Sequence, residues 1–175
     1  MTIFICFKSR ARRIYQPAHS VAASTLACTC KRNVLVPWLV ALALALTAQQ
    51  GHACTLNVTG VNFGSYDVFS NAALDSTGNI DVNCPSGVGY SIELSEGGGT
   101  QTQRVMGSGA QRLNYNLYIA ANRAVVWGDA TSGTVTVNGT GIGGSVNHWV
   151  YGRILALQNV HPGSYSDIII VELNF

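Results

Sequence analysis

Charged side chains are scarce in this sequence. They make up 10% of the 175 residues, against about 25% in an average soluble domain. No lysine follows Lys31, and no acidic residue precedes Asp67. Disordered chains combine high charge with few apolar residues, so a hydrophobic content of 47% argues against disorder. With 19 glycines and only 4 prolines, the composition favours short strands joined by tight turns, in a chain long enough for one domain.

The few charges divide the sequence into two parts. Before Cys54 there are six basic residues and no acid, whereas from Cys54 onward four arginines stand against eight acids, a net charge of −4. Nucleic-acid binding requires clustered Lys and Arg that displace counterions from phosphates. Because the four arginines are scattered, the sequence predicts no nucleic-acid binding.

An uncharged run, Val34–Ala48, follows Lys31 and Arg32. A basic flank, an apolar run and small residues before Cys54 are typical of a secretory signal peptide. The alternative is a transmembrane helix, but spanning a bilayer takes roughly 20 residues. The run has 15, and Pro37 interrupts it. We therefore expect export rather than anchoring.

The signal peptide divides the chain into two segments. Residues 1–53 are predicted to be an N-terminal extension plus the signal, removed on export, with no role for residues 1–33 in the mature protein. Residues 54–175 are predicted to form the mature domain, without a membrane anchor. A lipoprotein is the alternative, since a cysteine follows the cut, but Gly51 and His52 fit a lipoprotein signal poorly.

Apolar and polar residues alternate along the predicted mature domain. This period of two indicates strands with one buried and one solvated face, as in antiparallel sheets. Glycine-rich clusters separate the runs and predict turns. The alternating apolar residues are Ile80, Val82, Tyr90, Ile92, Leu94, Leu113, Tyr115, Leu117, Ile119, Val135 and Val137, and the predicted turns lie at 76–79, 97–99, 107–109 and 139–145. The pattern predicts an all-β fold, an antiparallel β-sandwich.

The two cysteines of this domain, Cys54 and Cys84, share the parity of the apolar residues on their strands. Both thiols are therefore expected to point to the apolar side, and in an exported domain such a pair is expected to be oxidised. Two cysteines without further Cys or nearby His make a poor zinc site. We predict a disulfide and no metal or other cofactor.

The last predicted strand places Ile169, Val171, Leu173 and Phe175 on one face, and no further strand follows it. The sandwich is therefore expected to be incomplete, of immunoglobulin-like type and lacking its final strand. An open groove beside the last strand would expose core residues and unpaired backbone groups, which is an aggregation hazard. A strand supplied by another protein would cover it.

Short motifs spread over the whole mature chain resemble the spore coat protein U domain family, which includes subunits of archaic chaperone–usher pili. Each motif is weak alone, but their order and spacing are specific. The motifs are Cys54-Thr55, Phe63 to Asp67, Val82 to Cys84, Leu113 to Tyr118, Val126 to Asp129, Val150 to Arg153 and Pro162 to Asp167.

The resemblance implies an incomplete immunoglobulin-like sandwich that a periplasmic chaperone and then the next subunit complete, with assembly at an outer-membrane usher. By position, Ile169, Val171, Leu173 and Phe175 would then bind the chaperone. Polymerising subunits also carry a donor segment before the first cysteine. Cleavage after Ala53 would leave none, and cleavage after Ala48 would leave only Gln49 to Ala53, which is too short and too polar. We therefore expect a subunit at a tip or chain end, or a protein that works outside a fibre.

Other functions have weaker support in the sequence. No catalytic motif surrounds His148 or His161, so we predict no enzyme activity. Trp127, Trp149 and Tyr151 are candidate ligand-facing aromatic residues, although aromatic residues in a sandwich more often fill the core. Three functions stay open: a pilus or surface-fibre subunit, a spore or cell-surface coat protein that assembles by lateral contacts, and a small carbohydrate-binding module.

Overall fold

The structure is a computed structural model that describes residues 3–13 and 53–175. The predicted signal peptide, Val34–Ala48, lies outside these residues and stays a prediction. The described part contains ten strands and no α-helix. Consequently, it holds no helix of the length and hydrophobicity needed to cross a membrane.

Short connections join β6 to β7 and β8 to β9, at two of the predicted glycine-rich turns, whereas the β7–β8 connection is long. Their bounds are β1 Ile3–Arg12, β2 Thr55–Thr59, β3 Asn62–Gly64, β4 Leu74–Asn83, β5 Gly89–Leu94, β6 Arg104–Ser108, β7 Gln111–Tyr118, β8 Val137–Thr140, β9 Ser145–Ile154 and β10 Tyr165–Asn174.

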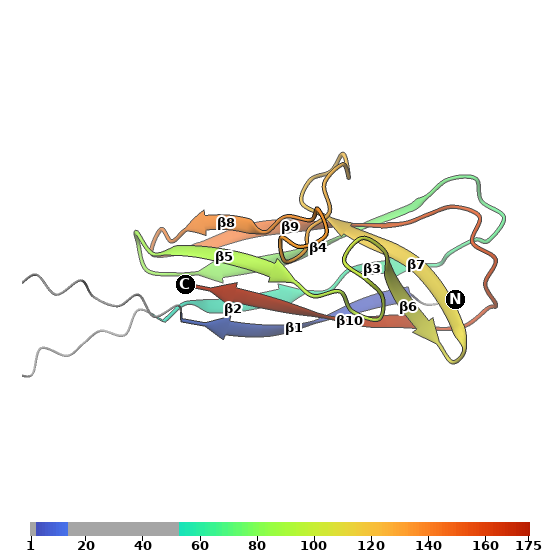
Figure 1. The fold of residues 1–175 in the computed structure, drawn as a ribbon, viewed down its shortest axis with the longest axis horizontal. Coiled ribbons are helices and arrows are strands. Elements are labelled where there is room, and N and C mark those ends of the chain that lie inside the picture. The colour runs from blue at the N-terminus through green and yellow to red at the C-terminus, as the bar shows by residue number, and fades with distance from the viewer. Residues whose placement is uncertain (1–2, 14–52) are drawn as a thin grey trace, which may run out of the picture. The chain divides into compact units, whose positions relative to one another are not determined.

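Strand pairing arranges these elements in two layers (Figure 1). One layer has the order β2-β4-β9-β7, with antiparallel neighbours throughout. The other has the order β8-β5-β10-β1. Strand β6 joins the layers, because it pairs with β7 along its length and with β10 at Gly107 and Ser166. This arrangement confirms the predicted all-β sandwich.

The alternating residues form the core between the layers, as the period of two predicts. Most are fully buried, including Ile80, Ile92, Leu113 and Leu117 at 0% exposed. A disulfide joins Cys54 and Cys84 at the edge of this core, with their Cα atoms 4.4 Å apart. The predicted disulfide is confirmed.

One predicted turn, at residues 76–79, is wrong. These residues lie in the middle of β4, which pairs with β9 over its full length. The glycine in this stretch serves close packing: a Cβ atom added to Gly78 would lie 2.8 Å from the carbonyl oxygen of Thr59 and 2.9 Å from Cγ2 of Val61. Glycine within a strand often marks such a close approach rather than a turn.

Loops at the end of the molecule opposite the C-terminus are tied together by Tyr66. Its hydroxyl donates a hydrogen bond to the carbonyl oxygen of Leu155 (2.8 Å) and accepts one from the backbone N–H of Gln158 (2.8 Å). Asp67 accepts a hydrogen bond from the N–H of Phe69 at 2.9 Å and so closes a local turn. These contacts hold the β3–β4 connection against the β9–β10 connection.

Candidate strand-acceptor site beside the last strand

Strand β10 has different neighbours on its two edges. One edge pairs with β5, where Val171 faces Leu94 and Leu173 faces Ile92, and with β6 at Ser166. The other edge pairs with β1 along its whole length. Residues 54–175 therefore contribute no strand to that second edge in the described part of the chain, which matches the predicted missing strand.

Strand β1 fills this position, and it runs parallel to β10. The register begins with Ile3 opposite Tyr165 and ends with Arg12 opposite Asn174. All other strand pairs in the described residues are antiparallel. The ladder continues to the C-terminus, where the N–H of Phe175 donates to the carbonyl oxygen of Arg12 at 3.0 Å.

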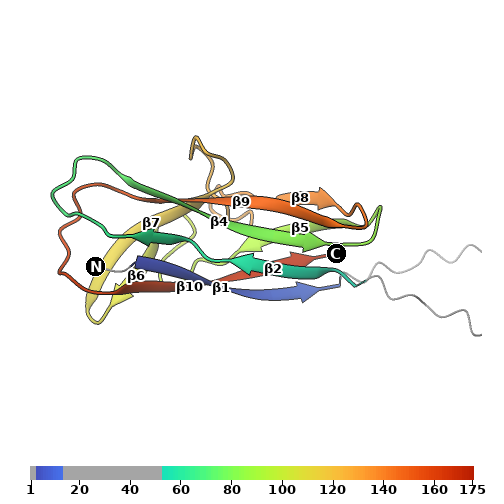
Figure 2. The same ribbon diagram turned by 180° about the vertical axis from the view of Figure 1, so that it is seen from behind.

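The other edge of β1 reaches the opposite layer. The N–H of Ile5 donates to the carbonyl oxygen of Val61 at 2.8 Å, and Ile3 pairs with Gly64 of β3. A side chain at residue 60 would overlap the carbonyl oxygen of Ile5, so Gly60 permits this approach. Figure 2 shows β1 next to β10. By pairing with both layers, β1 closes one side of the sandwich.

Side chains of β1 enter the core only near its start. Ile5 is 2% exposed, and Phe7, opposite Ile169, packs partly buried against the core. Further along the same face, Ser9 and Ala11 are exposed. Their partners on β10, Val171 and Leu173, are nevertheless buried at 0% exposed. The first half of β1 thus supplies most of the apolar contact and the second half mainly backbone pairing.

In the full chain, Ile3–Arg12 occupies the edge of β10 that the sequence predicts to be open for a strand from another protein. The removal of residues 1–53 on export, which would leave this edge open in the mature domain, stays a prediction. The sequence signal for this strand was the continuous apolar run from Ile3 to Phe7. It went unrecognised because these residues precede the predicted signal peptide.

Three of the four residues predicted to bind a chaperone or donor strand are fully buried on β10, and that role stays a prediction. Ile169, Val171 and Leu173 are fully buried on the inner face of β10, and Phe175 is partly buried against the core. The opposite face of β10 carries Ile168 and Ile170, which are 61% and 41% exposed. The strand is therefore apolar on both faces.

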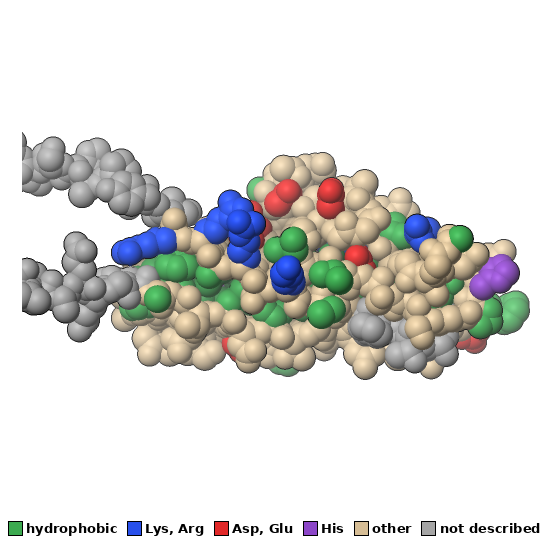
Figure 3. Space-filling view, turned by 90° about the horizontal axis from the view of Figure 1, so that it is seen from below, with side chains coloured by type: hydrophobic (Ala, Val, Ile, Leu, Met, Phe, Trp, Pro, Cys, Tyr) green, Lys and Arg blue, Asp and Glu red, His purple; other side chains and the backbone are tan. Residues whose placement is uncertain are grey.

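Charges of opposite sign meet on the outer surface of β1 and β10. Arg12 forms an ion pair with Glu172. A small hollow of about 190 Å³ adjoins them, lined by Arg10, Glu93 and Asp129 among others. Figure 3 shows basic side chains gathered beside acidic ones on this face. Since Arg12 and Glu172 are solvent-exposed in part, this pair contributes little to stability, about 0–1 kcal/mol.

A buried arginine fixes the connections next to the start of β10. Arg104 is 0% exposed, and its guanidinium donates to the carbonyl oxygens of Ser95 and Trp127 (both 2.9 Å), to Oδ1 of Asn116 (2.7 Å) and to Oε1 of Gln101 (2.8 Å). Among the described residues no carboxylate forms an ion pair with it. Burial lowers the pKa of Arg104, yet these four acceptors satisfy the guanidinium charge.

The three candidate ligand-facing aromatic residues differ in exposure. Trp127 is 1% exposed and donates its indole N–H to the carbonyl oxygen of Ile92 at 3.1 Å, so the structure assigns it to the core and corrects that prediction. Trp149 is 54% exposed, and Tyr151 is partly buried beneath the guanidinium of Arg123, 5.9 Å from the ring centre. Only Trp149 presents an open ring to solvent.

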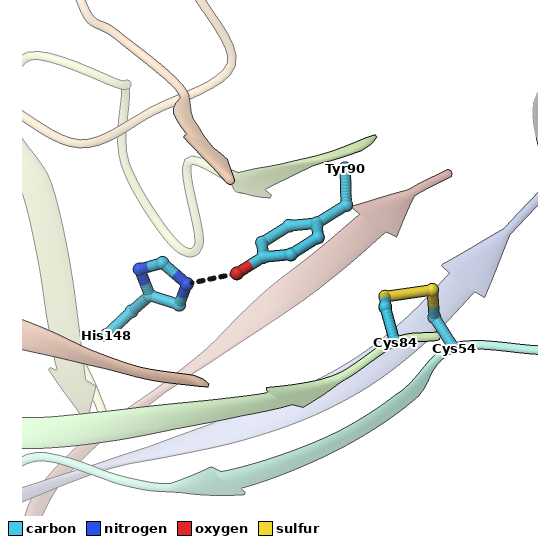
Figure 4. Close-up of a disulfide and its surroundings, with 4 residues drawn as sticks. All are labelled: Cys54, Cys84, Tyr90 and His148. Carbon is cyan, nitrogen blue, oxygen red and sulfur yellow. Dashed lines mark hydrogen bonds between the residues drawn. A yellow bond between two sulfur atoms is a disulfide. The ribbon is translucent and has the colours of Figure 1, made fainter. Parts of the chain in front are cut away.

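Near the disulfide, Tyr90 and His148 join the two layers from inside (Figure 4). The Tyr90 hydroxyl and His148 Nε2 are 2.9 Å apart, and the rings meet edge to face. Burial lowers the pKa of His148 below its usual value, although Asp81 opposes the shift. Burial also raises the pKa of Tyr90, so the contact joins a neutral phenol to a neutral imidazole and is structural. Among the described residues no group of three or more His, Cys, Asp or Glu side chains lies close enough to hold a metal ion.

Residues 40–172 match the family described as Spore Coat Protein U domain. The chain belongs to this family. Protein U of Myxococcus xanthus is 34% identical over 146 residues, which cover 73% of this chain and 80% of that protein. Strand β1 lies outside the residues that match the family.

A solved structure shares the fold of this Spore Coat Protein U domain. It is the chaperone–tip adhesion subunit pre-assembly complex, CsuC–CsuE, of the archaic chaperone–usher Csu pili of Acinetobacter baumannii. The match has a TM-score of 0.52 and 19% sequence identity, and it covers 70% of this chain. The match spans 40% of the length of the solved chain, so the likeness concerns the fold alone.

Proposed function

We propose that this chain is an exported, non-enzymatic structural subunit of a bacterial surface assembly, and that the groove beside β10 accepts a strand from another protein. The observation that carries the proposal is the second edge of β10. Residues 54–175 leave this edge without a partner, and a ten-residue strand from outside the family-matched region occupies it. The groove therefore has the shape and hydrogen-bonding capacity to take up a separate strand.

Removal of residues 1–53 on export would take β1 away. The N–H and C=O groups on that edge of β10 would lose their partners, and the core beside Ile169 would lose Ile5 and Phe7. Such an edge aggregates unless it is covered. We propose that a periplasmic chaperone covers it first and that a neighbouring subunit covers it after assembly at an outer-membrane usher. With its own N-terminal strand removed, the subunit would stand at the end of a fibre.

A second candidate is a spore or cell-surface coat protein that assembles by lateral contacts. The exposed Ile168 and Ile170 favour it, because they present an apolar stripe on the outer face of β10. The similarity to Protein U of Myxococcus xanthus also supports a coat protein, because the family that this chain matches is described as Spore Coat Protein U domain. In this case the subunits would associate through sheet faces and not through exchanged strands.

The test is to express the full chain in a bacterium with a secretory pathway, alone and with a candidate periplasmic chaperone. We expect the exported product to begin within a few residues of Cys54, by intact mass, and to remain soluble only as a one-to-one complex with the chaperone. A stable, soluble and monomeric exported product without any partner would contradict the proposal.

Two variants on adjacent residues of β10 provide the matched comparison. Ile169→Asp places a charge in the groove and is expected to abolish the chaperone complex, whereas Ile168→Asp places it on the outer face and is expected to leave the complex intact. If instead Ile168→Asp prevents assembly of the protein into larger particles while the chaperone has no effect, the lateral coat assembly is supported.

A further inference from the structure

A second hollow lies on the other side of the sandwich, along β9. Strand β9 pairs with β4 over its whole length, but with β7 only from Tyr151 to Ile154. Its edge from Ser145 to Val150 has no strand beside it in the described part of the chain. A hollow of about 190 Å³, open to solvent, occupies this place.

The walls of this hollow are partly apolar and partly polar. Asn147, His148, Trp149 and Tyr151 line it from β9, Ile119 and Val137 line the opposite side, and the buried Trp127 forms its floor. One face of Tyr151 is covered by Arg123. The half-exposed indole of Trp149 is therefore the flat apolar surface left for a ligand.

Polar groups surround the Trp149 ring. Across the sheet, Trp149 lies opposite Asn79 of β4, whose Oδ1 is covered and accepts no hydrogen bond from any described residue. The neighbouring Asn147 is exposed and donates from Nδ2 to Oδ1 of Asp81 at 2.9 Å, which fixes its amide in place. Arg123, the nearest cation, already pairs with Asp75 at 3.2 Å. Among the described residues that line the hollow, Asn147 thus offers an amide group, and none is an arginine or a lysine.

These features select among ligand classes. A phosphate or carboxylate ligand would need an unpaired cation, which the rim does not provide. A protein interface needs about 800 Å² on each partner with an apolar centre, but the outward neighbours of Trp149 are polar. The volume is below the roughly 300–1,000 Å³ of sites for drug-sized ligands, so it suits a single ring. A sugar ring has an apolar C–H face and a rim of hydroxyl groups, which match an indole bordered by amides.

We propose that this hollow binds one neutral pyranose ring of a surface glycan, with Trp149 stacking on its C–H face and Asn147 hydrogen-bonding its hydroxyls. The hollow is separate from the groove beside β10, so this inference stands independently of strand acceptance. A subunit with both features would attach to glycans through one side while its groove joins the assembly.

The experiment uses the full chain and four probes: glucose, galactose, mannose and N-acetylglucosamine. Saturation-transfer NMR and tryptophan fluorescence measure binding. We expect saturable binding of at least one sugar, weakened at least tenfold in Trp149→Ala and in Asn147→Ala. Phe69→Ala, which removes an aromatic ring that is 87% exposed in the β3–β4 connection, is the matched control and is expected to bind as the unmodified protein does.

Absence of saturable binding for all four sugars would overturn the proposal, and so would equal binding by Trp149→Ala. Urea unfolding of each variant shows whether it is folded. If Trp149→Ala does not fold, Trp149→Tyr, which keeps a smaller stacking ring, is expected to bind more weakly than the unmodified protein; unchanged binding by this variant counts against the site. Chaperone-complex formation by the same variants should be unchanged, which separates failure here from failure of the proposed function.

Discussion

The hydroxyl of Tyr115 on β7 donates a hydrogen bond to Oδ2 of Asp167 on β10 at a distance of 2.7 Å. The same carboxylate accepts from the N–H of Gly98, at 3.1 Å to Oδ1. Burial, reinforced by the charge of Asp167, raises the pKa of Tyr115 far above its usual value, so the phenol remains a donor. This carboxylate joins the start of the last strand to β7 and to the 95–103 connection.

Replacing Tyr115 with Phe is expected to lower the free energy of unfolding by about 1.5–3 kcal/mol, the usual contribution of a hydrogen bond to a charged group. Urea unfolding measures it. Tyr118→Phe, on the same strand, is the control, because its hydroxyl has no hydrogen-bond partner among the described residues, and its stability should change little. An equal loss in both variants would mean that the contact to Asp167 is not the cause.

Arg104→Lys is expected to destabilise the domain by about 3 kcal/mol or more. A lysine cannot reach the four acceptors of the planar guanidinium, and each buried acceptor left unsatisfied costs about 1–3 kcal/mol. Arg112→Lys, at an exposed position on β7, is the matched control and should stay within about 0.5 kcal/mol of the unmodified protein. Equal unfolding midpoints for the two variants would show that Arg104 does not organise these connections.

His148 predicts a pH dependence of stability. Its pKa is lowered by burial from the usual 6.5, so the folded state favours the neutral ring. The stabilisation is fully present above pH 6.5 and is lost as the pH falls below that value toward the folded-state pKa. Urea midpoints at pH 7.5, 6 and 5 measure it. His148→Gln should flatten this part of the profile, while His161→Gln, at an exposed position, should keep it.

Reduction of the Cys54–Cys84 disulfide is expected to lower the free energy of unfolding by about 3–4 kcal/mol, since the bond closes a loop of 30 residues. The comparison is urea unfolding with and without dithiothreitol, and the double variant Cys54→Ser/Cys84→Ser should behave like the reduced protein. If dithiothreitol still lowers the stability of the double variant, the loss cannot come from the Cys54–Cys84 disulfide and must come from another cysteine.

The contact of β1 with the core can be tested in the full chain. Ile5→Ala is expected to cost about 2–5 kcal/mol, as for other buried Ile truncations, because Ile5 is 2% exposed. Lys8→Ala, on an exposed position of the same strand, should change stability by less than about 0.5 kcal/mol. If both variants unfold like the unmodified chain, β1 does not contribute to the sandwich in solution.

The sequence predicts the sandwich and the groove residues because their signal is local. Alternation along β5 and β7, and at the end of β10 in Val171, Leu173 and Phe175, indicates which face is buried. Cys54 and Cys84 share the parity of the apolar residues on their own strands. The predicted turn at residues 76–79 was wrong because its glycine and polar residues are also typical of turns. Only the close approach of Thr59 and Val61 explains why a glycine lies within a strand here. That approach depends on residues far away in the sequence.

Two parts of the site were beyond the sequence for physical reasons. The partners of Arg104 are backbone carbonyls and side-chain amides from three segments: the β5–β6 connection, β7 and the β7–β8 connection. None of these groups is charged, so the sequence shows no charge pattern that would predict the site. The apolar run at the start of β1 can be seen in the sequence, but only the fold shows that this segment pairs with the edge of β10. The exposure of Trp149 and the burial of Trp127 likewise depend on the tertiary structure, because they follow from where the pairing of β9 with β7 ends.

The parallel direction of β1 has a topological consequence. Because Arg12 lies opposite Asn174, the chain leaves β1 at the same end of the sandwich where β2 begins and the C-terminus lies (Figure 1). A single peptide-bond cleavage between residues 14 and 52 would therefore leave every strand of the described residues intact. It would convert the first strand from a covalent part of the fold into a bound peptide, which a competing strand can displace by mass action.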